Sequence, residues 1–248
     1  MKTNPAIVAL LIFGMSPQAL AGPPLSIDDP GVLDAWHWEI IGATTLTSSS
    51  GGDYWQAPLL DISLGVLQDY VQVGFVYPYA HADSGNGGTQ SDFGNAEFGV
   101  KWRFFKNERL QMAFAPYRAF GVSSRTAASG IGNESDATVL PINAEYRLDD
   151  RWTLNGEVRY VGVDSASNEW GYGAAVAFAP NDRWTLLAEV AGASDTGFDN
   201  NFLELRVGFD AALNDSFHVL VSIASGIKEP SGAGELDYDI FLGLQFFP

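Results

Sequence analysis

The sequence predicts an all-β protein, a transmembrane antiparallel up-and-down β-barrel of about 12 strands. Three observations predict this fold. Polar and apolar residues alternate with a period of two along successive stretches, several stretches begin near a tryptophan, and long and short connections alternate between them. A strand of this kind turns its apolar side chains to lipid and its polar side chains to an enclosed lumen.

The clearest strand is 151–161, in which Trp152 and Leu154 share an apolar face and the intervening residues are polar. A closely similar stretch, 182–190, follows and again places a tryptophan, Trp184, at the start of the apolar face. Tryptophan prefers the headgroup level of a bilayer. The repeated pattern therefore predicts a hairpin unit that crosses a membrane, and the rest of the chain reads as further copies of it.

In the first half of the barrel, six strands are predicted at 35–46, 54–66, 70–79, 94–105, 109–119 and 138–148. Each has apolar residues at alternate positions and polar residues between them. Their predicted lipid-facing residues are Trp36, Trp38 and Ile40; Leu60, Ile62 and Leu64; Val71, Val73, Phe75 and Tyr77; Ala96, Phe98, Val100, Trp102 and Phe104; Leu110, Met112 and Phe114; and Leu140, Ile142, Ala144 and Tyr146.

In the second half, six more strands are predicted at 151–161, 170–179, 182–190, 202–211, 217–225 and 237–247. Strand 170–179 differs from the others because its inward positions carry the small residues Gly171, Gly173, Ala175 and Ala177. The last strand is rich in aromatic residues, which is typical of barrels that the outer-membrane assembly machinery inserts, although Pro248 follows it. The predicted membrane-interface aromatics are Trp36, Trp38, Trp102, Trp152, Trp170 and Trp184.

The connections are short after even strands and longer after odd strands. Short turns are predicted at 68–69 and 106–108, for example, and long loops at 80–92 and 121–135. This asymmetry is typical of outer-membrane barrels, whose short turns face the periplasm. Both termini of the barrel are therefore predicted to be periplasmic.

The first 21 residues read as an export signal: a lysine near the start, an apolar run at 6–15 and a small-x-small cleavage site that ends at Ala21. The alternative is a transmembrane anchor, for which the apolar run is short. The predicted organisation is 1–21 signal peptide, 22–33 irregular periplasmic lead-in and 34–248 transmembrane barrel, and the predicted location is the bacterial outer membrane.

Composition excludes several functions. The chain has no cysteine, which excludes disulfides and thiolate metal sites. The net charge of −17 makes nucleic acid an improbable partner. After residue 21 no apolar run is long enough for a transmembrane helix. The main alternative fold is a soluble β-sandwich or a lipocalin-like barrel, in which the apolar faces would point inward.

The predicted lumen-lining residues are charged: Glu39, Asp61, Glu97, Lys101, Arg103, Glu145, Arg147, Glu157, Arg159, Glu189, Glu204 and Arg206. On three strands a carboxylate and a guanidinium stand two residues apart, as in Glu157 and Arg159. Such residues form either a salt-bridge lattice that makes buried charge tolerable or a filter that selects the solute, and both roles are compatible. The sequence does not decide whether the lumen is open or plugged.

Other chemistry finds less support. An outer-membrane acyl hydrolase would need a serine and a histidine on the lipid-facing side, whereas Ser222 and His218 are predicted to face inward. No dinucleotide or phosphate-binding motif occurs, and no cofactor or metal is predicted. The long loops are acidic, which fits a solvated surface or contact with lipopolysaccharide through divalent cations.

Several short motifs resemble one family. They are Pro23-Pro24 with Asp28-Asp29-Pro30-Gly31, His37-Trp38-Glu39-Ile40, Pro58-Leu59-Leu60-Asp61, Gly99-Val100-Lys101-Trp102-Arg103-Phe104, Leu140-Pro141-Ile142 and Gly156-Glu157-Val158. In this order they resemble the bacterial outer-membrane proteins known as the MetA pathway of phenol degradation family, or simply as transporters. The resemblance covers essentially the whole mature chain and implies a barrel that passes small hydrophobic or aromatic compounds, without binding residues to carry over.

The leading functional prediction is therefore an outer-membrane channel or transporter for small molecules, and not an enzyme. Its expected partners are outer-membrane lipid and lipopolysaccharide, the barrel assembly machinery and an unidentified solute. The alternative is a plugged structural or surface-binding barrel that contacts lipopolysaccharide or a partner protein.

Overall fold

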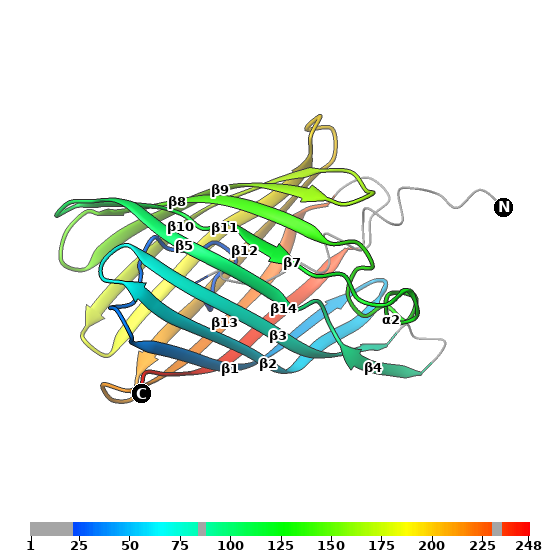
Figure 1. The fold of residues 1–248 in the computed structure, drawn as a ribbon, viewed down its shortest axis with the longest axis horizontal. Coiled ribbons are helices and arrows are strands. Elements are labelled where there is room, and N and C mark those ends of the chain that lie inside the picture. The colour runs from blue at the N-terminus through cyan, green and yellow to red at the C-terminus, as the bar shows by residue number, and fades with distance from the viewer. Residues whose placement is uncertain (1–21, 84–87, 230–234) are drawn as a thin grey trace.

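The computed structural model describes residues 22–83, 88–229 and 235–248, which form one antiparallel sheet closed into a barrel (Figure 1). The elements, in chain order, are β1 (Trp38–Ser49), β2 (Gly52–Leu67), β3 (Val71–Asp83), β4 (Thr89–Phe93), β5 (Glu97–Lys106), β6 (Leu110–Phe114), β7 (Tyr117–Ala119), α2 (Ser124–Ala128), β8 (Ala137–Arg147), β9 (Trp152–Val163), β10 (Glu169–Asn181), β11 (Trp184–Asp195), β12 (Asn201–Ala212), β13 (Phe217–Lys228) and β14 (Leu236–Phe246). None of the described helices is long and apolar enough to cross a membrane.

The wall of the barrel contains 12 strands, as predicted. Consecutive strands pair around the ring, and β14 closes it by pairing with β1 from Ile40–Phe246 to Ser49–Leu236. Strands β6 and β7 together make one wall position, because both pair with β5 on one side and with β8 on the other. Strand β4 pairs with β3 alone and prolongs the wall beyond β5.

Many strand ends differ from the predicted ones by a few residues, and two segments differ in kind. The strand predicted at 109–119 is interrupted at Ala115 and Pro116, since proline cannot donate a ladder hydrogen bond. The wall stays closed there: the Ala115 N–H donates to the Pro141 carbonyl, and the Pro116 carbonyl accepts from Val100. The loop predicted at 80–92 is wrong in its bounds, because β3 and β4 extend into it as a hairpin.

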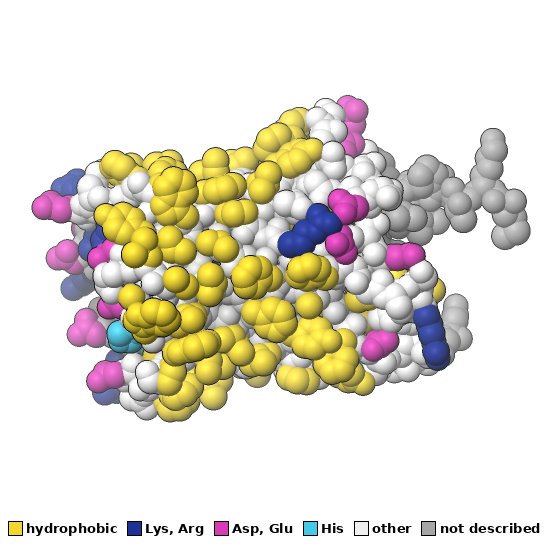
Figure 2. Space-filling view, in the orientation of Figure 1, with side chains coloured by type: hydrophobic (Ala, Val, Ile, Leu, Met, Phe, Trp, Pro, Cys, Tyr) yellow, Lys and Arg dark blue, Asp and Glu magenta, His cyan; other side chains and the backbone are white. Residues whose placement is uncertain are grey.

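Apolar side chains cover the outside of the barrel. Figure 2 shows them as a belt on the visible face, with acidic and basic side chains concentrated toward the two ends. Exposed residues of this belt, such as Phe98, Val158 and Leu242, alternate along their strands with buried neighbours. In water such a surface would be unstable, whereas a bilayer accommodates it.

The tryptophans occupy both ends of the wall. Trp38, Trp102, Trp152 and Trp184 are between 40% and 51% exposed and lie in the halves of β1, β5, β9 and β11 nearer the short-turn end. Trp170 lies at the opposite, long-loop end and is only partly exposed. Trp36 was expected within the first strand, but it precedes β1 with a positive φ of 68° and is 75% exposed.

The interior of the barrel is largely filled. One apolar cluster, formed by inward residues of the wall, contains Ile41, Ala43, Leu59, Val76, Tyr117, Val139, Leu220 and Phe241. A second consists of Leu25, Ile27, Ala175 and Ala191 and joins the N-terminal residues to β10 and β11. Buried charged residues occupy much of the remaining space.

Candidate functional site: the occupied lumen

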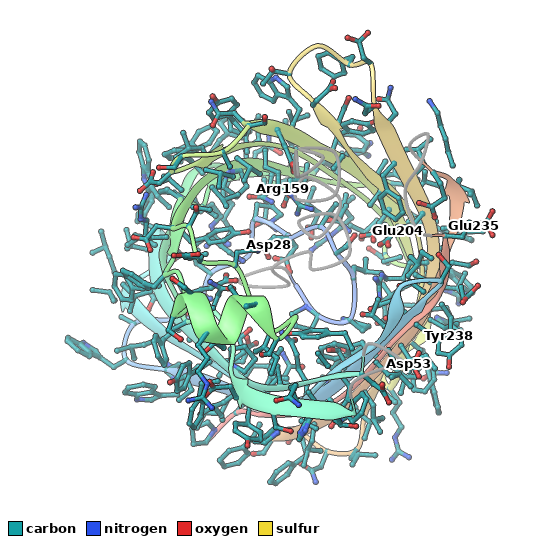
Figure 3. The ribbon with its side chains drawn as sticks, turned by 90° about the vertical axis from the view of Figure 1, so that its right-hand side faces the viewer. Asp28, Asp53, Arg159, Glu204, Glu235 and Tyr238 are labelled. Atoms are coloured by element: carbon teal, nitrogen blue, oxygen red, sulfur yellow. The ribbon has the colours of Figure 1, made fainter. Side chains whose placement is uncertain are left out.

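Residues 22–33, which we call the lumen segment, lie inside the barrel. The sequence predicts an irregular periplasmic lead-in here; the contacts place it within the ring of strands, and its periplasmic side stays a prediction. Figure 3 looks into the barrel from the long-loop end and shows Asp28 within the ring of strands. Ser26 and Asp28 are buried, with 6% and 3% of their surface exposed. The segment has the irregular backbone that its three prolines favour, so its polar groups need partners on the wall.

Carboxylates of β9 and β11 bind the backbone of the lumen segment. The Glu189 carboxylate accepts hydrogen bonds from the N–H groups of Ser26 at 3.1 Å and Ile27 at 3.0 Å, and from the Ser26 hydroxyl. The Glu157 carboxylate accepts from the Asp28 N–H at 3.0 Å. Hydrogen bonds to charged acceptors are stronger than neutral ones, so these contacts hold the irregular segment firmly.

Arg159 of β9 lies next to these carboxylates and also binds the lumen segment. Its Nη1 donates to the Ser26 carbonyl at 3.1 Å and to Glu157 Oε1 at 2.9 Å. The predicted pair Glu157 and Arg159 is therefore an ion pair, and both of its members also bind the lumen segment. This pair has the salt-bridge role considered for the lumen charges, and it also binds the lumen segment, which the sequence did not predict.

Other strands hold the segment from the remaining sides. Lys101 of β5 forms an ion pair with Asp28 at 2.8 Å. Asn143 of β8 donates to the Asp28 carbonyl at 3.2 Å. Ser222 of β13 donates to the Pro24 carbonyl at 2.6 Å, and Gln72 of β3 accepts from the Leu33 N–H at 3.0 Å. Strands all around the ring thus contribute contacts, and the segment spans the lumen rather than lying along one wall.

Small residues on β10 leave room for the segment. A Cβ atom on Gly173 would lie 2.5 Å from Ile27 Cγ2, and one on Gly171 would lie 2.5 Å from Arg159 Nε. Ala175 packs in the same cluster as Ile27. The unusual run of small inward residues on this strand was visible in the sequence, and it was the one signal that a further element occupies the lumen.

Arg206 lies among several buried carboxylates next to the lumen segment. Its guanidinium lies 2.8 Å from Asp239, 3.1 Å from Glu204 and 3.8 Å from Glu189, and it donates to the Ser222 hydroxyl at 3.1 Å. Only 2% of its side chain is exposed. Because one buried cation faces three carboxylates, it keeps Glu189 and Ser222 in position for their bonds to the lumen segment.

The twelve predicted lumen-lining residues fall into three groups. Eight of them are buried inside the barrel: Asp61, Glu97, Lys101, Arg103, Glu157, Glu189, Glu204 and Arg206. Glu39, Glu145 and Arg159 are partly buried, and Arg147 is exposed. No ion pair joins Glu145 and Arg147 in the described structure; Glu145 instead accepts a hydrogen bond from Gln111 at 3.1 Å. The role of these residues in solute passage stays a prediction.

Charged residues gather at the short-turn end of the barrel. Arg103 donates to the Asp69 carboxylate at 2.9 Å, and Lys106 donates to it at 2.8 Å. The hydrogen bond from Lys106 and the positive charges of Lys106 and Arg103 hold the pKa of Asp69 below its usual range. A cavity of ≈ 380 Å³ lies at this end, lined by side chains that include Arg147 and Thr153.

At the long-loop end a charged cluster lies on the outer wall. Arg118 of β7 forms ion pairs with Asp136 at 2.9 Å and Asp164 at 2.6 Å, and it donates to the Thr138 hydroxyl. The hydrogen bond from the Gly121 N–H and the contact with Arg118 lower the pKa of Asp136. A cluster with this charge needs a polar environment, so it marks the edge of the apolar belt.

The residues considered for catalysis are engaged elsewhere. Ser222 donates to Pro24 and accepts from Arg206. His218 Nδ1 lies 2.8 Å from Asp210, and its ring packs against Phe247. Within the described residues, no group of three or more histidine, cysteine or acidic side chains is arranged to hold a metal. The geometry thus supplies no serine and histidine arranged for hydrolysis at Ser222.

Comparisons with solved structures bear on the fold. An outer membrane channel from Pseudomonas putida F1 superposes with a TM-score of 0.73 at 12% identity, covering 89% of this chain and 98% of that one. The fold is an outer-membrane-type barrel. The KdgM porin superposes with a TM-score of 0.59 at 10% identity, covering 84% and 98% of the two chains. The CymD monoaromatic hydrocarbon channel gives 0.53 at 10% identity, with coverage of 95% and 93%.

No family model and no curated protein matches the chain. The resemblance to the MetA pathway of phenol degradation family therefore stays a prediction. At 10–12% identity the superpositions establish the architecture and leave the solute open.

Proposed function

We propose that this protein is an outer-membrane channel through which small molecules pass, and that the lumen segment forms its constriction. The observation that carries the proposal is the way the lumen is occupied. A segment held mainly by hydrogen bonds and ion pairs, such as that of Lys101 with Asp28, occupies the lumen beside polar groups of the wall. Water and polar solutes can replace such contacts, whereas a continuous apolar core offers them no path.

The charge of the lumen supports a preference against anions. Buried carboxylates outnumber buried cationic side chains in the described barrel; they are Asp28, Asp61, Glu97, Glu157, Glu169, Glu189, Glu204 and Asp239, against Lys101, Arg103 and Arg206. Rings of acidic side chains favour cations and neutral solutes. The inward apolar residues Leu59, Val76 and Tyr117 are compatible with solutes that have a small hydrophobic or aromatic body, as the family resemblance implies.

The proposed topology follows from the two ends of the wall. The C-terminus and the short turns lie together at one end of the barrel (Figure 1), and in outer-membrane barrels that end faces the periplasm. Export through a signal peptide cleaved near Ala21 and insertion by the barrel assembly machinery belong to the same proposal.

Planar-bilayer recording tests the proposal. The wild-type protein and a variant that lacks residues 23–31 are each reconstituted, and the ionic current is measured. We expect discrete current steps from both proteins and a larger conductance from the deletion variant, because its constriction is removed. Silence from both proteins would contradict the channel.

The second candidate is a plugged barrel that acts through its surface. The observation in its favour is the number of strands that hold the lumen segment, including β5, β9 and β11. In this case the acidic loops and the cluster around Arg118 would contact lipopolysaccharide through divalent cations. Silence in the bilayer combined with lipopolysaccharide binding that depends on Mg²⁺ would favour this candidate.

A further inference from the structure

Two buried carboxylates lie in one row across the wall, away from the bonds that hold the lumen segment. Asp61 of β2 pairs with Val76 of β3, and Val76 pairs with Glu97 of β5. Both acidic residues face inward, with 5% and 3% of their surface exposed. Neighbouring strands are about 4.8 Å apart, so the two residues stand two strand spacings apart on the concave inner face, with the buried Val76 between them.

Neither carboxylate has a partner in the described part of the chain. Asp61 Oδ1 and Glu97 Oε2 are buried without a hydrogen bond, and neither residue forms an ion pair there. Lys101, on the same strand as Glu97, is engaged with Asp28 at 2.8 Å, and Arg159 of β9 is engaged with Glu157 at 2.9 Å. Buried carboxylates without partners are costly, so this row is suited to a positive charge that the described residues do not supply.

The surroundings indicate what kind of cation fits. Ile41 pairs with Asp61 across β1 and β2, and it belongs, with Leu59, Val76 and Tyr117, to the larger apolar cluster. Aliphatic side chains favour a hydrocarbon body, and the face of a tyrosine ring attracts a cation. The described residues contain no set of three or more acidic or histidine ligands for a metal ion. Two carboxylates beside apolar side chains instead suit an ammonium group with its three N–H donors.

We propose that Asp61 and Glu97 form a subsite for a protonated primary amine that carries a small apolar body. The subsite deepens the proposed channel function and rests on it, since it names the class of solute that the lumen recognises. The ammonium group bonds to the two carboxylates, and the hydrocarbon part contacts Val76 and Leu59.

Current block by n-butylammonium tests the subsite, with n-butanol as the uncharged probe. The comparison uses the wild type, the double variant Asp61→Asn with Glu97→Gln, and Glu169→Gln as the matched control. Glu169 is also a buried inward carboxylate, 6% exposed, but it lies on β10, which pairs with neither β2 nor β5. We expect the half-blocking concentration of butylammonium to rise about tenfold or more in the double variant and to rise much less in the control, which removes a lumen charge away from this row.

Equal block of the wild type and the double variant, or equal block by butanol, would overturn the subsite. A second measurement separates this failure from failure of the channel: the thermal melting of the detergent-solubilised barrel with increasing butylammonium. If the wild type passes no current and yet the amine raises the melting temperature only when both acids are present, the result supports the subsite and contradicts the channel. If current flows and neither the block nor the melting temperature depends on Asp61 and Glu97, the result supports the channel and contradicts the subsite. The single variants replace the double variant if it does not insert.

Discussion

Replacing Glu189 by glutamine should release the lumen segment while leaving the wall intact. The Glu189 carboxylate accepts from two backbone N–H groups and one hydroxyl of the segment, all at Ser26 and Ile27. A glutamine has one acceptor oxygen, so its NH₂ group would face at least one N–H donor of the segment. The change also removes one negative charge from the carboxylates around the buried Arg206.

The magnitude follows from these contacts. A hydrogen bond to a charged group contributes about 1.5–3 kcal/mol, so losing one of them and weakening the others should cost about 2–4 kcal/mol of docking free energy. Since 1.4 kcal/mol corresponds to a factor of ten, the undocked population should rise by roughly 30-fold to 700-fold.

Hydrogen exchange followed by mass spectrometry measures this population in detergent-solubilised barrels. Peptides that contain Ser26 and Ile27 should exchange at least ten times faster in Glu189→Gln, whereas peptides from β12 and β13 should exchange as in the wild type. Glu169→Gln is the control, because it removes a buried inward carboxylate that accepts no hydrogen bond from the described residues of the lumen segment. Unchanged exchange at Ser26 and Ile27 would refute the assignment of Glu189 as the anchor.

Three further predictions follow from other parts of the barrel. Gly173→Val should displace the lumen segment and raise conductance, since its Cβ would overlap Ile27 Cγ2; bilayer recording checks this, and a reduced conductance would contradict it. Val158→Arg places a charge on the lipid face and should lower the free energy of unfolding by about 2–4 kcal/mol, measured by urea titration in lipid vesicles. An unchanged free energy of unfolding would indicate that this face meets water. The pKa of Asp69 is lower in the folded protein than in the unfolded chain, so its contribution to stability is present above the unfolded pKa and is lost as pH falls through the folded pKa. The melting temperature should therefore fall less on acidification in Asp69→Asn than in the wild type.

The sequence by itself determined the wall of the barrel. Alternation such as that of Phe98, Val100 and Trp102 with Glu97 and Lys101 decides which side of a strand meets lipid, and this choice depends only on neighbouring residues. The strand number and the position of the short turns followed from the same local pattern. The break at Pro116 was missed because a single wall strand can continue its hydrogen bonding on both sides of a proline.

Only the tertiary structure decided what fills the lumen. Residues 22–33 have no periodicity, and Ser26 meets Glu189 across 163 positions of the chain, so no local pattern connects them. The sequence predicts that Asp61 and Glu97 face inward, but whether each finds a partner depends on where Lys101 and Arg159 bond. A strand's orientation is set by a two-residue period, whereas the occupancy of an enclosed space is set by distant groups that meet only when the ring closes.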